Sequence, residues 1–107
     1  MSRHGFTCRL QPEKIDAYKQ YHDTVWPEVQ RALKEAGVSN LSIFLLNETL
    51  FMYYEYSGNR PHEEAMAEYL TKPRIAEWEQ LMGTFKFEEN EAGGNGFTPM
   101  QEIFHLD

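Results

Sequence analysis

One stretch of the chain places a titratable side chain among aromatic ones. Tyr18, His22 and Trp26 follow one another at intervals of four residues, so on a continuous helix they lie along one face. Imidazole has an ordinary pKa close to neutrality, and it can therefore both give and accept a proton there. The stretch favours general acid–base chemistry centred on His22, which lies between a phenol and an indole.

Pro27 interrupts the helical pattern around these residues. A proline ring clashes with the carbonyl four residues earlier, here that of Asp23, so the helix is predicted to kink or restart near Asp23 and Thr24. His22 then lies near a helix end, where the helix dipole favours the imidazolium, whereas burial favours the neutral ring. A histidine on an apolar helix face is also commonly a hydrogen-bonded core residue, and the pattern leaves both interpretations open.

Length and composition predict a single globular domain, residues 1–107. The chain has 41% hydrophobic and 25% charged residues, as ordinary soluble domains do. No apolar run approaches the roughly 20 residues that cross a bilayer, and the N-terminus lacks the apolar segment of a secretory signal, so we expect a cytoplasmic protein. Ten basic against seventeen acidic residues give a net charge of −7. This charge disfavours nucleic acid and anionic membrane as partners.

The sequence shows no motif for a metal or a cofactor. The single cysteine, Cys8, cannot form an intramolecular disulfide, and the four histidines show no ligand pairing on adjacent helical turns. The glycines at 93, 94 and 96 follow an acidic run and precede no helix, unlike those of a phosphate-binding loop. We therefore expect neither a bound metal nor a cofactor.

Hydrophobic periodicity predicts four strands and two broken helical regions. Apolar residues alternate with a period of two over residues 5–10, 41–46, 50–56 and 99–106. The second and third of these strands form a hairpin. One helical region lies between the first and second strands, from Pro12 to Ala36, with Gly37 as its C-terminal cap. The other lies between the third and fourth strands, from Pro61 to Gly83, with a break near Pro73. The order βαββαβ predicts an α+β, ferredoxin-like fold, with helices on one face of an antiparallel four-stranded sheet.

This arrangement leaves the other face of the sheet uncovered. Aromatic and aliphatic residues occur on both faces of the strands 41–46 and 50–56, so the open face needs a partner. A second copy of the chain about a two-fold axis is the economical one, and we expect a homodimer. Residues 88–98 are polar, glycine-rich and without period, which predicts a loop that can act as a lid.

With these elements assigned, the chain resembles the L-rhamnose mutarotases over nearly its whole length. The likeness is carried by Tyr18-x-x-x-His22-x-x-x-Trp26-Pro27-Glu28, Leu33-Lys34 through Gly37 and Asn40, Leu50-Phe51 with Glu55, Trp78 with Met82, and Gln101-Glu102-Ile103-Phe104. The resemblance implies a dimeric α/β barrel that interconverts the α and β anomers of a 6-deoxyhexose without a cofactor. L-Rhamnose is the expected monosaccharide, and L-fucose, also a 6-deoxyhexose, is its competitor.

The resemblance also implies roles for particular residues. His22 matches the family's catalytic acid, and Tyr18 and Trp78 match substrate-contacting positions. Leu41 stands where the family pattern has a tyrosine and Glu79 where it has a second tryptophan, so these departures bear on which sugar is bound. Each residue also has a simpler interpretation: Tyr18 and Trp78 as core side chains, and Glu79 as an exposed helix glutamate.

Mutarotation requires an acid and a base. A proton goes to the ring oxygen, another leaves the anomeric hydroxyl, the aldehyde end rotates and the ring closes on either face. A histidine with a pKa near the working pH can accelerate such proton transfer by ~10²- to 10⁴-fold. Two other functions fit the same architecture: a cofactor-free or haem-linked monooxygenase, and a dimeric small-molecule sensor whose aromatic pocket binds without reacting.

Overall fold

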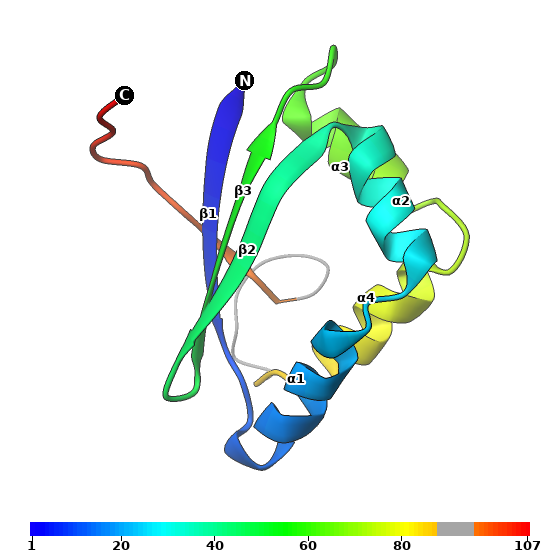
Figure 1. The fold of residues 1–107 in the computed structure, drawn as a ribbon, viewed down its shortest axis with the longest axis vertical. Coiled ribbons are helices and arrows are strands. Elements are labelled where there is room, and N and C mark those ends of the chain that lie inside the picture. The colour runs from blue at the N-terminus through cyan, green and yellow to red at the C-terminus, as the bar shows by residue number, and fades with distance from the viewer. Residues whose placement is uncertain (88–95) are drawn as a thin grey trace.

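The computed structural model describes residues 1–87 and 96–107, which form a four-stranded sheet with helices on one face (Figure 1). The elements are β1 (Ser2–Arg9), the 3-10 turn η1 (Pro12–Lys14), α1 (Ile15–Asp23), α2 (Pro27–Ala36), β2 (Val38–Leu46), β3 (Thr49–Tyr56), α3 (His62–Tyr69), α4 (Ile75–Gly83) and β4 (Thr98–Met100). The strand order is β2-β3-β1-β4, and each neighbouring pair is antiparallel. This topology confirms the predicted α+β, ferredoxin-like fold.

Proline and glycine set the boundaries of the helices, as predicted. α1 ends at Asp23, and Pro27 begins α2, where its missing N–H costs no hydrogen bond. Gly37 caps α2 with a φ of 100°, and a Cβ at this position would lie 3.0 Å from the backbone nitrogen of Gly58. Glycine is therefore required there. The second helical region breaks into α3 and α4, but α4 runs through Gly83 without a left-handed cap.

The predicted hairpin is formed by β2 and β3. Its turn holds Asn47 at a φ of 55°, a conformation that asparagine tolerates better than most residues. The register between the two strands shifts between Ser39 and Ser42, so β2 carries an irregularity close to Leu41. β1 pairs with β3 along its length, from Ser2 opposite Tyr56 to Arg9 opposite Thr49.

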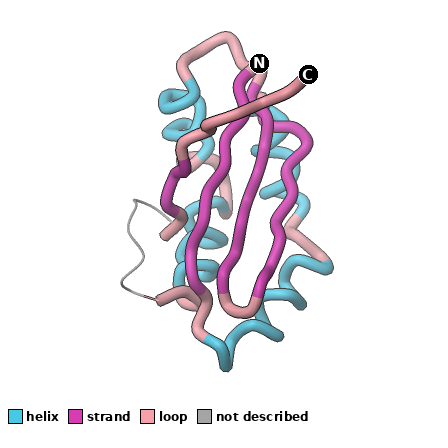
Figure 2. Tube along the Cα trace, turned by 90° about the vertical axis from the view of Figure 1, so that its left-hand side faces the viewer, coloured by secondary structure: helices cyan, strands magenta, loops and turns pink. Residues whose placement is uncertain are grey.

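The last strand is shorter than predicted. We expected a strand over residues 99–106, whereas β4 spans Thr98–Met100 and pairs with Gly5, Phe6 and Thr7 of β1. Alternation of apolar residues alone does not make a strand, because the backbone N–H and C=O groups of a strand also need hydrogen-bond partners on a neighbouring strand. Residues 101–107 leave the sheet edge and cross its open face as a tail (Figure 2). Three apolar side chains of this tail are at least 78% exposed: Ile103, Phe104 and Leu106.

The predicted lid loop is only partly within the described residues. Its positions 88–95 lie outside them. Positions 97 and 98 are not loop-like, because Phe97 is buried in the core and Thr98 already belongs to β4. The predicted loop therefore extended two residues too far toward the C-terminus.

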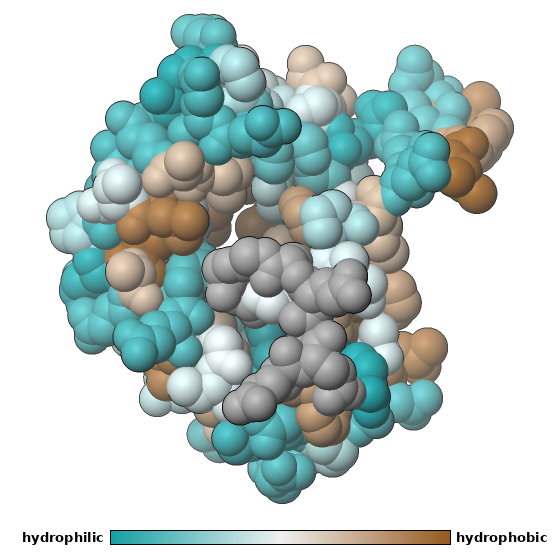
Figure 3. Space-filling model, turned by 180° about the vertical axis from the view of Figure 1, so that it is seen from behind, coloured by the Kyte–Doolittle hydropathy of each residue, from teal (hydrophilic) through white to brown (hydrophobic). Residues whose placement is uncertain are grey.

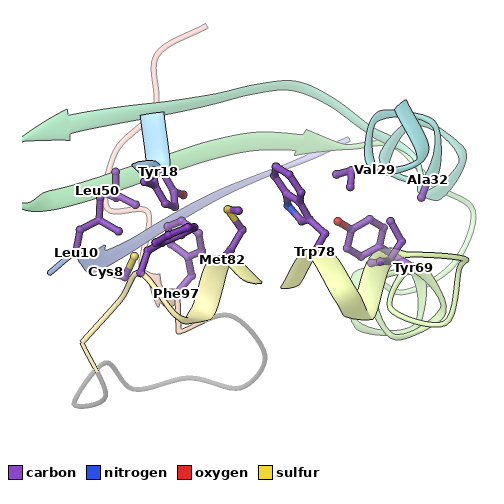
Figure 4. Close-up of a cluster of buried hydrophobic side chains, with 12 residues drawn as sticks. Cys8, Leu10, Tyr18, Val29, Ala32, Leu50, Tyr69, Trp78, Met82 and Phe97 are labelled. Atoms are coloured by element: carbon purple, nitrogen blue, oxygen red, sulfur yellow. The ribbon is translucent and has the colours of Figure 1, made fainter. Parts of the chain in front are cut away.

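The core lies between the inner face of the sheet and the helices. Cys8 and Leu50 contribute from the sheet, and Tyr18, Trp78 and Met82 contribute from α1 and α4 (Figure 4). The side chains of Leu10, Leu50 and Ile75 are fully buried. Within the described ranges no helix is long and apolar enough to cross a membrane.

The outer face of the sheet carries exposed apolar side chains, as the alternation predicted. Phe44 and Leu46 of β2 are 63% and 64% exposed, and Phe51 of β3 lies opposite Phe44 in the register. In Figure 3, apolar atoms also gather on the projecting segment at the upper right, which is the C-terminal tail. The described part of the protomer leaves these side chains in contact with solvent.

Candidate active site

His22 lies in the last turn of α1 and is held there in a defined orientation. Its Nδ1 atom is 2.9 Å from the carbonyl oxygen of Tyr18. Because a carbonyl oxygen only accepts hydrogen bonds, Nδ1 carries a proton and donates it. Nε2 is therefore the ring nitrogen that can gain or lose a proton. His22 lies at a helix end because Pro27 prevents α1 from continuing into α2. α1 ends at Asp23, and α2 begins at Pro27.

The local environment favours the neutral imidazole. His22 is half-buried, and burial lowers its pKa, while the hydrogen bond to the Tyr18 carbonyl and the nearby Asp23 carboxylate partly offset this effect. A positive charge on Lys86 lowers the pKa further. Burial thus outweighs the hydrogen bond and the Asp23 carboxylate, and the lowered pKa makes Nε2 mostly a proton acceptor at neutral pH.

The structure brings three of the predicted site residues together. The Tyr18 ring stacks on His22 with centroids 4.3 Å apart, and the Trp78 indole meets His22 edge-on at 5.6 Å. Trp26, the residue before α2, packs on Trp78 at 5.1 Å. The imidazole therefore lies between a phenol from its own helix and an indole from α4.

Tyr18 and Trp78 are also core side chains, as the simpler interpretation predicted. Trp78 is 5% exposed, and Tyr18 is equally buried. Burial raises the pKa of Tyr18 well above its usual range, and the thiol of Cys8 and the carboxylate of Glu79 add to this effect. The Tyr18 phenol therefore stays protonated, so it can donate a hydrogen bond but cannot act as a base near neutral pH.

Glu79 is not an exposed helix glutamate. Its side chain is half-buried, and the hydroxyl of Tyr69 donates a hydrogen bond to its Oε1 atom over 3.2 Å. Its negative charge contributes to the raised pKa values of Tyr18 and Tyr69. It also favours the charged form of Lys86 and so opposes the lowering of the lysine pKa by burial. This carboxylate therefore faces the interior, on the side of α4 that also carries Trp78.

Leu41 is placed differently from the other predicted site residues. It is half-buried in β2, next to the shift in register between Ser39 and Ser42. It does not belong to the cluster of packed apolar side chains that includes Tyr18 and Trp78. Among the described residues, His22, Tyr18 and Trp78 thus contact one another, Glu79 contacts Tyr69, and Leu41 lies outside the packed cluster.

Sequence reasoning missed Lys86. This residue follows α4 and forms an antiparallel bridge with Leu10 at the end of β1. Only 3% of it is exposed, and its ammonium lies 3.8 Å from the centre of the Phe97 ring. Burial lowers the pKa of Lys86 to about 8, against the opposing influence of Cys8 and Glu79. A lysine between two phenylalanines, Phe85 and Phe87, was the available signal.

A second group of titratable side chains was also missed, between β1 and α3. The rings of His4 and His62 stack with centroids 3.8 Å apart, and Tyr54 shares a 2.6 Å hydrogen bond with Nε2 of His62. Burial lowers the pKa of both histidines and raises that of Tyr54 to about 12. In residues 1–87 and 96–107, no three His, Cys, Asp or Glu side chains converge as metal ligands.

Comparison with known proteins identifies the family. A family model described as L-rhamnose mutarotase matches residues 3–106. The chain belongs to the L-rhamnose mutarotase family. This membership confirms the predicted family and the predicted enzyme class, an isomerase that acts on carbohydrates.

Three similar proteins illustrate the relationship. An L-rhamnose mutarotase of Lactiplantibacillus plantarum is 34% identical over 109 residues, covering 100% of both chains. A UPF0734 protein of Dictyostelium discoideum is 37% identical over 101 residues, which is 89% of this chain and 80% of that protein. The crystal structure of an L-rhamnose mutarotase from Formosa agariphila superposes with a TM-score of 0.76 at 27% identity and covers 100% of both chains. The family likeness therefore extends to the fold over the full length.

Proposed function

We propose that this member of the L-rhamnose mutarotase family interconverts the α and β anomers of L-rhamnose. The observation that carries the proposal is the state of His22, whose Nδ1 is tied to the Tyr18 carbonyl so that Nε2 is presented for proton transfer. Mutarotation needs no other chemistry than proton transfer to and from two oxygens of the sugar. Family membership and the names of the relatives support the choice of sugar.

Each aromatic neighbour has a proposed part in this reaction. The Tyr18 carbonyl fixes the tautomer of His22, and the Tyr18 ring holds the plane of the imidazole by stacking. The Trp78 indole lies beside His22, and its apolar surface is the proposed contact for the methyl or C–H side of a deoxy sugar. Glu79, in polar contact with Tyr69, accepts hydrogen bonds from sugar hydroxyls.

Exchange NMR between the two anomers at equilibrium tests the proposal directly. The parent protein should accelerate exchange of L-rhamnose above the spontaneous rate, and His22→Ala should lose ~10²-fold of that gain. His22→Asn is the matched variant, because an asparagine amide can still donate to the Tyr18 carbonyl but cannot exchange a proton near neutral pH.

The outcomes separate four cases. Equal loss in both variants supports proton transfer by His22. Activity retained in His22→Asn but lost in His22→Ala assigns His22 a purely structural hydrogen bond. A parent protein that exchanges L-fucose but not L-rhamnose moves the proposal to the competing sugar, and a parent that exchanges neither overturns it.

We also propose that the protein is a homodimer in which a second copy covers the open face of the sheet. The support is the exposure of Phe44, Leu46 and Phe51 together with the apolar tail that crosses the same face. Exposed apolar surface of this kind on a sheet is costly for a monomer. Sedimentation equilibrium should give twice the monomer mass at micromolar concentration, and Phe44→Ser should weaken the association. A stable monomer at that concentration contradicts this proposal.

A further inference from the structure

Two histidines that the proposed reaction does not use lie face to face between the sheet and α3. His4 belongs to β1, and His62 is the first residue of α3. Their rings stack with centroids 3.8 Å apart and planes inclined by 13°. Both segments lie in the upper part of the molecule in Figure 1. The pair therefore connects the first turn of α3 directly to the sheet.

A hydrogen bond from β3 favours the neutral form of His62. The hydroxyl of Tyr54 lies 2.6 Å from Nε2 of His62, and it is the one hydrogen bond of this hydroxyl within the described ranges. Tyr54 is buried, so its proton needs an acceptor in the protein, and Nε2 provides a lone pair. An added proton turns Nε2 into a donor and takes away the acceptor of the phenol proton.

The surroundings of the pair also favour neutral rings. The titratable and charged groups around it come from β3, from α3 and from the loop between them: Tyr54, Tyr56, Arg60, Glu63 and Glu68. Glu63 favours the charged form of His62, but burial and the neighbouring His4 lower the pKa of His62 below its ordinary value. Burial also lowers the pKa of His4. The partial positive charge at the start of a helix disfavours a cation at His62 as well.

We propose that the stacked rings of His4 and His62 form an acid-sensitive latch, which holds α3 on the sheet at neutral pH and releases it in acid. Two imidazolium rings at this separation repel each other, so the stacked pair binds its second proton less readily than its first. Separated rings in water bind protons near the ordinary histidine pKa of about 6.5. The released state therefore binds more protons than the latched state, and its population rises as the pH falls below about 6.5.

Release of α3 extends to the candidate active site. The helix has 8 residues, and without its first turn it keeps few internal hydrogen bonds. Its last residue, Tyr69, donates a hydrogen bond to Glu79 of α4, next to Trp78 in the sequence. Opening of the latch removes this contact. The inference does not depend on the proposed reaction, because the opening of α3 is measured without a sugar.

Native-state hydrogen exchange between pH 7 and pH 4.5 tests the latch in the parent protein. The backbone amides of α3 report its local opening once the intrinsic exchange rate at each pH is removed, and the amides of α2 serve as the reference for global unfolding. Opening of α3 relative to α2 should increase by more than ~10-fold per pH unit below pH 6.5, because more than one proton is bound on release.

Two variants reduce the number of protons without removing the packing. His62→Gln still offers a carbonyl oxygen to the Tyr54 hydroxyl but binds no proton near neutral pH. His4→Phe keeps a ring against His62 without a charge. In each variant one histidine of the pair remains, so the relative opening should increase by at most ~10-fold per pH unit. His105→Gln, in the exposed tail, is the matched control and should keep the parent dependence.

Several outcomes overturn the proposal. Parallel opening of α3 and α2 in the parent means that no local latch exists. A dependence steeper than ~10-fold per pH unit in His62→Gln or His4→Phe means that the protons bind elsewhere. NMR titration of the imidazole signals adds a readout in the parent, which stands even where a variant fails to fold. If His4 and His62 both titrate at or above pH 6.5, or if His4→Phe leaves the midpoint of His62 unchanged, the stacked rings do not repel each other's proton.

Discussion

Replacing Lys86 by methionine should make the protein more stable at neutral pH, and the size of the gain follows from its burial. The structure lowers the pKa of this ammonium from 10.5 to about 8, chiefly through burial. Since a tenfold change in proton affinity is worth about 1.4 kcal/mol, the folded state carries about 3 kcal/mol of unfavourable free energy at pH 7, where the lysine is charged. Methionine has a similar length and no charge.

The lowered pKa of Lys86 determines both the sign of the stability change and its dependence on pH. A lysine whose folded pKa lies below its unfolded value destabilises the fold at low pH, and this penalty fades as pH rises from about 8 toward 10.5. Loss of the contact between the cation and the Phe97 ring offsets about 1 kcal/mol of the gain. We therefore expect Lys86→Met to be about 2 kcal/mol more stable at pH 7, with the difference falling by about 2 kcal/mol between pH 7 and pH 9.5.

Urea unfolding at the two pH values measures this difference, with the exposed Lys34→Met as the control that should show no such pH dependence. A Lys86→Met protein that is less stable than the parent at pH 7 contradicts the reasoning. A stability difference that is the same at both pH values also contradicts it, because the charge of Lys86 would then not be the cause.

Three further predictions concern the fold. Burial lowers the pKa of His4, His22 and His62, so their neutral forms favour the folded state: the free energy of unfolding should fall as pH drops from about 6.5 through these lowered values, and a urea series that shows no fall between pH 7 and 5.5 would rule this out. Gly37→Ala should cost about 1 to 3 kcal/mol in a thermal melt, because its φ of 100° and the nearby Gly58 backbone leave no place for a Cβ. Ile75→Ala should cost about 2 to 5 kcal/mol, since its side chain has no exposure; a change below 1 kcal/mol would mean that the core closes around the missing atoms.

The sequence was sufficient for the order of elements and for most of their boundaries, because those depend on local rules. Pro27 restarts a helix and Gly37 ends one through backbone geometry that neighbouring residues hardly modify. The length of the last strand was overestimated. Alternation of apolar residues indicates which side chains share a face, whereas a strand also needs a neighbouring strand to pair with, and the sequence does not specify that neighbour.

Helical spacing predicted the candidate site only where its members share a helix, whereas Trp78 of α4 was expected from the family resemblance. His22 and Tyr18 are four residues apart, so helical spacing alone placed them together. Glu79 was expected either at a departed family position or as an exposed helix glutamate, but its contact with Tyr69 joins α4 to α3, and no local pattern predicts such a contact. Lys86 was missed for a similar reason: its burial depends on a bridge to Leu10, from the opposite end of the chain.

That bridge also bears on the order in which the protein folds. The backbone of the segment after α4 pairs with the end of β1 through the bridge between Lys86 and Leu10. Two hydrogen bonds form this bridge: the Gln11 amide donates to the Phe85 carbonyl, and the Phe87 amide donates to the Arg9 carbonyl. Gln11 and Lys86 are 75 residues apart, whereas the β2–β3 hairpin and the helices form from local contacts. Contacts of such high sequence separation form late, because the intervening chain must first be ordered. A chain with its hairpin and helices in place still lacks this pairing between the two distant segments, so on refolding the helical signal should recover before Lys86 becomes buried.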